Sequence, residues 1–493
     1  MDIYQYIDSL MVYGEKCHLY NPLDYEYTLN ALLAVLKLKD YKEVENHIEM
    51  ELDDILEGII EYAINEKIIE NTQESKDLFD TKVMGVLTPK PSEIINQFDY
   101  SLIFTSSPEK ATDYFYNLCK NTNYIRTTRI SKDIHFDYES EYGTITISIN
   151  MSKPEKDPND IKKLLTMKQV AYPKCMLCKE NVNYEGRIGF PARGNLRTIP
   201  VRLDDSRYYI QYSPYSYYNE HLICFHEEHF NMIINDNTIK ELVEFVFKFP
   251  HYFIGSNADL PIVGGSILNH QHFQGGRAIL PMQNAKEVYI KEIDGVKIYK
   301  LNWPLSVIRI RSVSKTKLVQ VACKILKDWF SYKNEELNII NEDQDGRHNT
   351  ITPICRMNKD EFEMDLVLRN NLTSKERPLG IYHPREEYWH IKKENIGLIE
   401  VMGLAILPSR LKKEMELVKK YLLKQGLSEE ENKQIEKHLI WANNLAKNND
   451  INESNVEKVV NDGVGEVFTK VLKDCAVFKN ENQKEFDEFI LAI

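Results

Sequence analysis

The stretch GGSILNHQHFQGG, residues 264 to 276, carries the clearest structural signal in the chain. The glycine pairs that bracket it disfavour a helix, so residues 266–274 are predicted to form a strand. Side chains alternate between the two faces of a strand, which puts His270, His272 and Gln274 on one face. A helix would place the two histidines about 200° apart around its axis. Three aligned nitrogen-bearing side chains, framed by glycines that let a ligand approach the backbone, indicate a functional site rather than solvated histidines on an edge strand.

The chemistry available to this face is transfer of a phosphoryl-linked group. A neutral imidazole is a good nucleophile near pH 7, and attack by His272 on phosphorus gives a phosphohistidine-type intermediate. Gln274 can donate from its amide to a phosphoryl oxygen, but it cannot act as a general acid. The leaving group must therefore be a good one, such as a phosphate, which favours nucleotidyl transfer from a pyrophosphate-linked donor. His270 can orient the site or bind a metal ion.

The composition limits the class of protein. The 493 residues are 43% hydrophobic and 28% charged, which is typical of a soluble globular chain with several domains. The formal net charge of −13 disfavours broad binding to nucleic acid or to a membrane surface. The longest apolar run, near residues 398–407, is interrupted by Glu400 and is too short to span a bilayer. The N-terminal stretch MDIYQYIDSL lacks the pattern of a signal peptide, so we expect a cytoplasmic protein without membrane or nucleic-acid partners.

A local basic cluster can bind a small anion although the whole chain is acidic. Its arginines are Arg187, Arg193, Arg197, Arg202 and Arg207. A solvated charged stretch is the alternative explanation for some of them. From this cluster we take Arg193 and Arg197 as candidate substrate-binding residues.

A second pattern, Cys175-x-x-Cys178, is typical of a zinc-binding turn. A tetrahedral zinc ion needs two further ligands, and the candidates are His221, His226, His229 and His270. The alternative is two ordinary reduced cysteines, because a cytosolic chain of this size needs no disulfide framework. The chemistry predicted for His272 requires no cofactor and no activated water, so a zinc ion bound here would be structural.

The order of elements indicates an α+β fold. Apolar residues recur at helical spacing in the first 120 residues and in the last 80, whereas YGTITISIN at 142–150 alternates as a strand does. The proline-rich residues 152–160 are predicted to form a loop. Strand–helix–strand order occurs around 184–274 and again around 305–369, which indicates two similar halves. We predict a mainly helical region at 1–122, a first half at 123–300, a second half at 301–410 and a helical region at 411–493.

Longer stretches of the sequence point to a family. They are YPKCMLCKENVNYEGRIGFPARGN, QYSPYSYYNEH, FPHYFIGSNADLPIVGGSILNHQHFQGG, HNTITPI and HIKKENIGLIEVMGLAILPSRL. Together they resemble the class II (bacterial) UDP-glucose–hexose-1-phosphate uridylyltransferases, usually called galactose-1-phosphate uridylyltransferases, of the histidine-triad superfamily. The resemblance covers residues 80 to about 412. It implies two histidine-triad-like halves with antiparallel half-barrel sheets, and a homodimer.

The resemblance also implies a ping-pong reaction. UDP-glucose gives its UMP to a histidine and releases glucose 1-phosphate, and galactose 1-phosphate then takes the UMP and yields UDP-galactose. His272 matches the nucleophile of the family, Gln274 the glutamine that contacts the transferred phosphoryl group, and His270 the first histidine of the H-x-H-x-Q pattern.

In the class I branch of the family, that first histidine binds zinc together with a CxxC pair and a further histidine. The matching residues here are Cys175, Cys178, His229 and His270. Asn257, Gly265 and Ser266 lie where the family contacts the nucleotide.

Alternatives to this activity stay open from the sequence. They are another histidine-triad nucleotidyltransferase, a phosphorylase or hydrolase, and a nucleotide-binding protein without catalysis. Glutamine at position 274 disfavours the hydrolase, and the intact H-x-H-x-Q pattern disfavours the non-catalytic protein.

Overall fold

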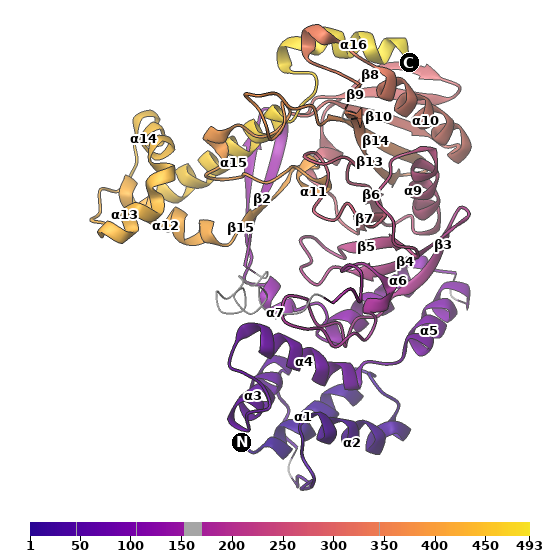
Figure 1. Cartoon of the computed structure of the whole chain (residues 1–493), viewed down its shortest axis with the longest axis vertical. Helices are drawn as coiled ribbons and strands as arrows, with labels where there is room; N and C mark the ends of the chain where they lie inside the picture. The colour runs from indigo at the N-terminus through magenta and orange to yellow at the C-terminus, as the bar shows by residue number, and fades with distance from the viewer. Residues whose placement is uncertain (46, 105, 152–169, 345) are drawn as a thin grey trace.

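The computed structural model describes residues 1–493 except 46, 105, 152–169 and 345, so the loop predicted for 152–160 lies outside the described residues. A ten-stranded antiparallel sheet forms its centre (Figure 1). In spatial order its strands are β3 (Ile199–Leu203), β4 (Ser206–Tyr212), β5 (Leu222–His226), β7 (His272–Gly276), β6 (Phe253–Gly255), β13 (Asn349–Asn358), β14 (Glu361–Asn370), β10 (Val307–Ser312), β9 (Val296–Leu301) and β8 (Glu287–Ile293).

The sheet consists of two halves with the same internal order. In each half, three strands precede a helix, two further strands of the sheet follow it, and the last of these pairs with the third. The fourth strands of the two halves, β6 and β13, pair with each other at the centre of the sheet through Ile254 with Cys355 and Gly255 with Ile354. The two similar halves indicated by the sequence are therefore joined in one continuous sheet. Strands β8 and β9 pair with β10 and belong to the second half of that sheet, although they lie almost entirely before residue 301.

The helices α9 (Asp236–Lys248) and α10 (Lys315–Ser331) cover one face of the sheet. Each is preceded by a polar N-cap residue, Asn235 before α9 and Ser314 before α10, whose side chain accepts from backbone N–H of the first turn. The apolar sides of both helices belong to one hydrophobic core, and that core also contains Phe273 of β7, which is fully buried. The neighbouring residues His272 and Gln274 therefore point to the opposite face of the sheet, which carries the functional site.

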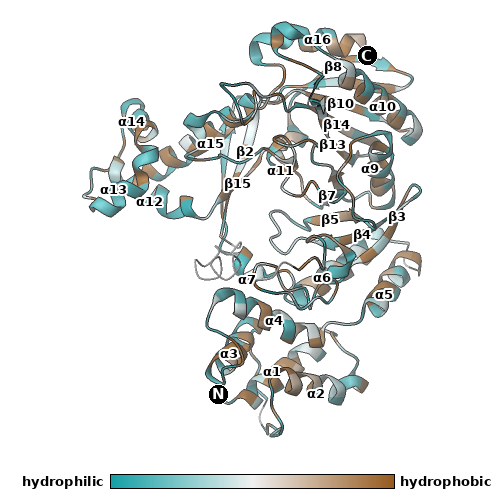
Figure 2. Ribbon diagram, in the orientation of Figure 1, coloured by the Kyte–Doolittle hydropathy of each residue, from teal (hydrophilic) through white to brown (hydrophobic). Residues whose placement is uncertain are grey.

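The N-terminal region is helical, as the sequence predicts. Its helices are α1 (Ile3–Lys16), α2 (Tyr25–Val35), α3 (Leu52–Asn65), α4 (Gln73–Leu87), α5 (Pro91–Phe104), α6 (Pro108–Asn121) and the short α7 (Thr127–Ile130). Their buried residues belong to the same hydrophobic core as α9 and α10, so this region is continuous with the sheet rather than a separate body. Figure 2 shows hydrophobic residues along the central strands and hydrophilic residues along the C-terminal helix α13 (Glu429–Ile435).

A second hydrophobic core lies on the other face of the sheet. It involves a small sheet of β1 (Ile134–Ser140), β2 (Gly143–Asn150) and β15 (Leu404–Pro408), in which β15 runs parallel to β2. The strand predicted from the alternation at 142–150 is thus confirmed as β2. The helices around this core are α11 (Leu398–Val401), α12 (Arg410–Leu422), α14 (Leu439–Asn448) and α15 (Val456–Asp474), and the chain ends with α16 (Gln483–Ala492) beside β8 and β9 (Figure 1). Among the described residues, no helix has the length and apolar character needed to cross a membrane.

Candidate active site and metal centre

The strand predicted for residues 266–274 is only partly present. Strand β7 begins at His272, and residues 266–271 run outside the sheet. This segment pairs instead with the turn after β5, because Met232 N–H donates to the carbonyl of Leu268 (2.8 Å) and Gln271 N–H to that of Phe230 (2.9 Å). The prediction that His270 shares a strand face with His272 is therefore wrong, since His270 lies just before the strand. The alternation does hold for His272 and Gln274.

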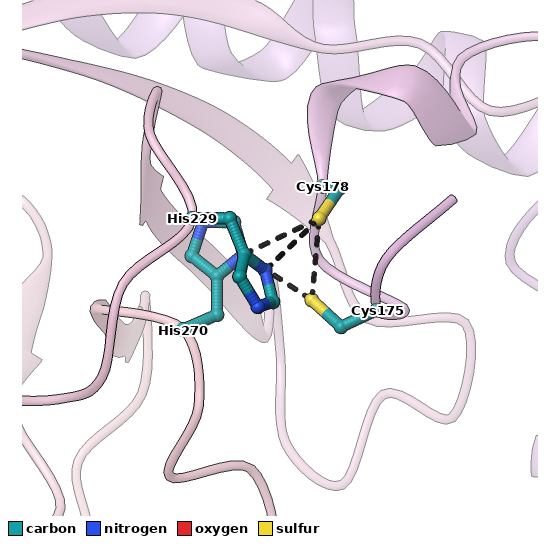
Figure 3. Close-up of side chains that lie close together, drawn as sticks. All are labelled: Cys175, Cys178, His229 and His270. Atoms are coloured by element: carbon teal, nitrogen blue, oxygen red, sulfur yellow. Dashed lines mark hydrogen bonds between the residues drawn. The ribbon is translucent and has the colours of Figure 1, made fainter. Parts of the chain in front are cut away.

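Four side chains from three segments meet beside the turn that follows β5 (Figure 3). Cys175 and Cys178 come from the CxxC turn, His229 follows β5, and His270 precedes β7. The Sγ atoms of the two cysteines are 3.5 Å apart. Nδ1 of His270 lies 3.2 Å from Sγ of Cys175, and Nδ1 of His229 lies 3.2 Å from Sγ of Cys178. All four ligand atoms lie within 4.8 Å of one another.

This geometry fits a tetrahedral metal ion. Zinc bonds of about 2.3 Å to sulfur and about 2.0 Å to nitrogen place the ligand atoms roughly 3.3–3.8 Å apart at the corners of a tetrahedron. Burial raises the pKa of the Cys178 thiol to about 12, so the environment alone does not favour a thiolate there. A dication is the group that makes a pair of thiolates stable in such surroundings.

The structure separates the four histidines that the sequence offered as metal ligands. The rings of His229 and His270 face the cysteines. The orientation of the His270 ring is fixed by its other nitrogen, because Nε2–H donates to the backbone carbonyl of His226 (2.8 Å). A hydrogen bond of this kind is typical of metal-bound histidines. The ring of His226 itself packs against Phe230, and the ring of His221 contacts Gln274.

The orientation of His272 is set by the backbone beside it. Its Nδ1–H donates to the carbonyl of His270 (2.8 Å), which leaves Nε2 as the nitrogen with a free lone pair. The side chain is 4% exposed, and burial lowers the pKa of His272 to about 4. The imidazole is therefore neutral at pH 7, which is the nucleophilic form. The Cys/His cluster and His272 are linked through one residue, since His270 contributes its ring to the cluster and its carbonyl to the hydrogen bond with His272.

Gln274 lies two residues further along β7, opposite Ile223 of β5. Its Oε1 is 3.2 Å from Nε2 of His221, a buried residue at the entry to β5. The next two positions must be glycine. A Cβ at Gly275 would lie 2.3 Å from the carbonyl oxygen of Phe253, and one at Gly276 would lie 2.5 Å from the ring of Tyr218. The glycines were expected to let a ligand approach the backbone, but at Gly275 and Gly276 the atoms that come close belong to Phe253 and Tyr218 of the protein itself.

Asn257 links the first half of the sheet to the C-terminal region. Its Oδ1 accepts a hydrogen bond from the N–H of Leu398 (2.8 Å), the first residue of α11. The amide lies directly against Gly265, where a Cβ would be 2.7 Å from Nδ2. Ser266, the next residue, is exposed. The structure thus brings Asn257 and Gly265 into contact and leaves Ser266 open to solvent.

The two candidate arginines differ in their surroundings. The guanidinium of Arg197 donates to four backbone carbonyls, those of Thr88, Pro89, Gly194 and Leu196, which ties the end of α4 to the sheet. Arg193 lies over the ring of Tyr124 at 5.9 Å, and its Nε is buried without a hydrogen-bond partner in the described structure. Of the two guanidinium groups, that of Arg193 is the one with a buried nitrogen that lacks a hydrogen-bond partner among the described residues.

Two family models match this chain over most of its length. Residues 20–231 match the N-terminal domain of galactose-1-phosphate uridyl transferase, and residues 245–442 match its C-terminal domain. The chain belongs to the galactose-1-phosphate uridylyltransferase family. Curated relatives carry the same description. The galactose-1-phosphate uridylyltransferase of Fusobacterium nucleatum is 45% identical, with 98% of this chain and 97% of that protein aligned. The protein of that name from Halalkalibacterium halodurans is 46% identical, with 98% and 97% aligned.

Family membership makes this chain a nucleotidyltransferase and supports the resemblance inferred from the sequence motifs. Sequence reasoning missed two features of the site in this family member. The first is the contact between His221 and Gln274, and the second is the hydrogen bond from Asn257 to α11. Neither has a signal in the sequence, because each depends on which strands and loops become neighbours in space.

Proposed function

We propose that the chain transfers UMP from UDP-glucose to galactose 1-phosphate through a covalent uridylyl group on Nε2 of His272. The observation that carries this proposal is the hydrogen bond from Nδ1–H of His272 to the carbonyl of His270 (2.8 Å). It fixes the tautomer in which Nε2 has the lone pair, on a strand face where Gln274 is the next side chain. A neutral histidine with a fixed ring is a suitable nucleophile for phosphorus.

In the first step, the Nε2 lone pair attacks the α-phosphorus of UDP-glucose. A nitrogen–phosphorus bond forms, and the bond from the α-phosphorus to the bridging oxygen breaks. Glucose 1-phosphate leaves with that electron pair and needs no proton, because a phosphate is a stable anion near pH 7. Gln274 donates an amide hydrogen to a non-bridging oxygen of the transferred group and stabilises the charge that develops there.

In the second step, a phosphate oxygen of galactose 1-phosphate attacks the same phosphorus. The nitrogen–phosphorus bond breaks, and UDP-galactose leaves. His272 leaves as a neutral imidazole, which is the form that burial stabilises. Gln274 cannot act as a general acid, which suits both steps, since each leaving group is good without protonation.

We propose that Cys175, Cys178, His229 and His270 hold a structural zinc ion. The ion would bind the CxxC turn to the segments on either side of the site, and it would supply no catalytic step. The effect on the site comes through His270. Because its ring is held at the cluster, its carbonyl stays in place to accept the hydrogen bond from His272. Fixed support of this kind is what positions a catalytic side chain to within a fraction of an ångström.

Substrate contacts are proposed for the residues that flank the nucleophile. Asn257, Gly265 and Ser266 are assigned to the nucleotide, because they lie on the loop that precedes His270 or directly against it. Arg193 is assigned to a phosphate group, because its guanidinium has an unpartnered Nε. The carbonyl contacts of Arg197 support a structural role for that residue.

Isotope exchange tests the central claim. The purified chain is mixed with UDP-glucose and labelled glucose 1-phosphate, with no galactose compound present. We expect label to enter UDP-glucose, and we expect His272→Ala to abolish the exchange. His251→Phe is the control, because it alters a different histidine, whose Nε2 contacts the Thr112 hydroxyl instead of the site. Binding of UDP-glucose without exchange would show that no uridylyl-histidine forms.

We also propose a homodimer, which the family resemblance implies. Light scattering during size-exclusion chromatography should give twice the chain mass of 57.8 kDa. A monomer mass over the whole elution peak would contradict this proposal.

A further inference from the structure

We propose that His221 is a positioning residue that fixes which way the Gln274 amide faces, an inference that rests on the function proposed above. The contact that carries it is between Nε2 of His221 and Oε1 of Gln274, at 3.2 Å. Gln274 is partly exposed at the site, whereas His221 lies behind it and is 3% exposed. His221 therefore acts on the substrate only through Gln274.

The direction of the amide decides whether Gln274 stabilises or repels the transferred phosphoryl group. A glutamine side chain ends in one acceptor and one donor group, and the torsion that exchanges them has two broad minima. When Nε2–H of His221 donates to Oε1, the NH₂ group is left for a phosphoryl oxygen. The reversed amide would present its oxygen to the negatively charged phosphoryl group, which is repulsive. A fixed amide thus supplies a preorganised donor.

The loop that carries His221 is held at several points. The carbonyl of His221 accepts a hydrogen bond from Ser213 N–H (2.7 Å), and the N–H of His221 donates to the carbonyl of Tyr218 (3.2 Å). Its ring lies against those of Tyr217 and Tyr218, with centroids 5.5 and 4.5 Å away. The hydroxyl of Tyr218 donates to the carbonyl of Gly275, directly after Gln274. The loop and β7 are therefore fixed to each other at the position of the amide.

The backbone just before His221 adopts an unfavourable conformation. Glu220 has φ of 53°, in the left-handed region that residues with a Cβ rarely occupy. Its carboxylate accepts a hydrogen bond from the Tyr252 hydroxyl and lies 3.6 Å from the guanidinium of Arg277. These contacts hold Glu220 in that conformation, which directs His221 inward. Such strain commonly occurs where a side chain must be held in one place.

The surroundings of His221 leave Gln274 as its main polar contact. His221 is not part of the metal cluster, although the sequence offered it as a ligand. Its Nδ1 is buried and has no hydrogen-bond partner among the described residues. Burial lowers the pKa of His221 to about 4, so the ring is neutral and carries one N–H. A buried imidazole whose one observed hydrogen bond goes to Gln274 fits a positioning role.

The test is a double-mutant cycle on the full chain, measured as exchange of labelled glucose 1-phosphate into UDP-glucose. His221→Phe keeps an aromatic ring between the tyrosines and removes the donor, so we expect kcat to fall by about tenfold, with KM for UDP-glucose changed less than about twofold. In a Gln274→Ala background, His221→Phe should have no further effect on kcat, because the residue acts only through the amide. His221→Gln, whose Nε2–H can reach the same oxygen, should restore kcat to within about threefold of the unmodified chain.

The control is His251→Phe, which removes a different histidine ring and its bond to Thr112. It should leave kcat unchanged, and melting curves of both Phe variants report any loss of folding. An undiminished kcat in His221→Phe overturns the inference, and so does an equal fall with and without Gln274. Exchange by the unmodified chain separates these results from failure of the proposed function. If the unmodified chain binds UDP-glucose without exchange, the proposed function and this inference are both overturned.

Discussion

Substitution of one glycine should show how tightly the site is packed. Gly265 lies against the amide of Asn257, and a Cβ at this position would be 2.7 Å from Nδ2 and 2.9 Å from Cγ. Atoms of these types do not approach below about 3.4 Å without strain. The Gly265→Ala variant must therefore push the Asn257 amide away by several tenths of an ångström. That movement pulls Oδ1 off the N–H of Leu398, which it accepts at 2.8 Å in a buried position.

Two losses add up to the expected decrease in the free energy of unfolding. Overpacking of a filled site costs about 1–3 kcal/mol, and a buried N–H left without an acceptor costs about 1–3 kcal/mol. We expect Gly265→Ala to lower the free energy of unfolding by about 2–6 kcal/mol. The Asn257→Ala background should reduce this penalty, because the side chain that collides is then absent.

Urea denaturation followed by circular dichroism measures this effect. Gly426→Ala is the matched control, because no heavy atom lies within 4 Å of its added Cβ and the residue is exposed. That control should change the free energy of unfolding by less than about 0.5 kcal/mol. If Gly265→Ala and Gly426→Ala unfold at the same urea concentration, or if the penalty is unchanged without Asn257, the packing argument is refuted.

Four further predictions concern the chemistry, the stability and the metal. Burial lowers the pKa of His272 to about 4. Transfer of labelled UMP from UDP-glucose to the protein should therefore vary little between about pH 6 and pH 8 and fall below about pH 5, where the ring gains a proton. A transfer rate that is half-maximal near pH 6.5 would contradict this prediction. The lowered pKa of His272 also affects stability, because His272 binds a proton more tightly in the unfolded chain than in the folded one. The free energy of unfolding should therefore decrease as the pH falls from about 6.5 towards 4. Elemental analysis should find one zinc ion per chain and none after Cys175→Ser with Cys178→Ser, whose melting temperature should also drop; unchanged zinc content would place the ion elsewhere. Gln274→Ala should slow exchange by about a hundredfold with little change in KM, and an undiminished rate would mean that another group holds the phosphoryl oxygen.

Regular elements with strong periodicity could be predicted from the sequence. The alternation at 142–150 became β2, and the helical spacing in the first 120 residues became the helices of the N-terminal region. The predicted strand at 266–274 is largely absent because residues 268–271 find their partners in the segment 230–233, so they leave the sheet until His272. Local pattern cannot show this choice, since it depends on a neighbour that lies far away in the chain.

The amino-acid sequence by itself determined the candidate reactive groups: a histidine predicted to be the nucleophile, a glutamine that cannot protonate a leaving group, and a CxxC pair. These follow from side-chain chemistry and short spacing, which do not depend on the fold. Only the tertiary structure decided the choice among histidines: His229 and His270 face the cysteines, while His221 contacts Gln274. The reason is that a hydrogen bond or a metal site requires atoms within about 4 Å, and the pairing of β5 with β7 sets those distances.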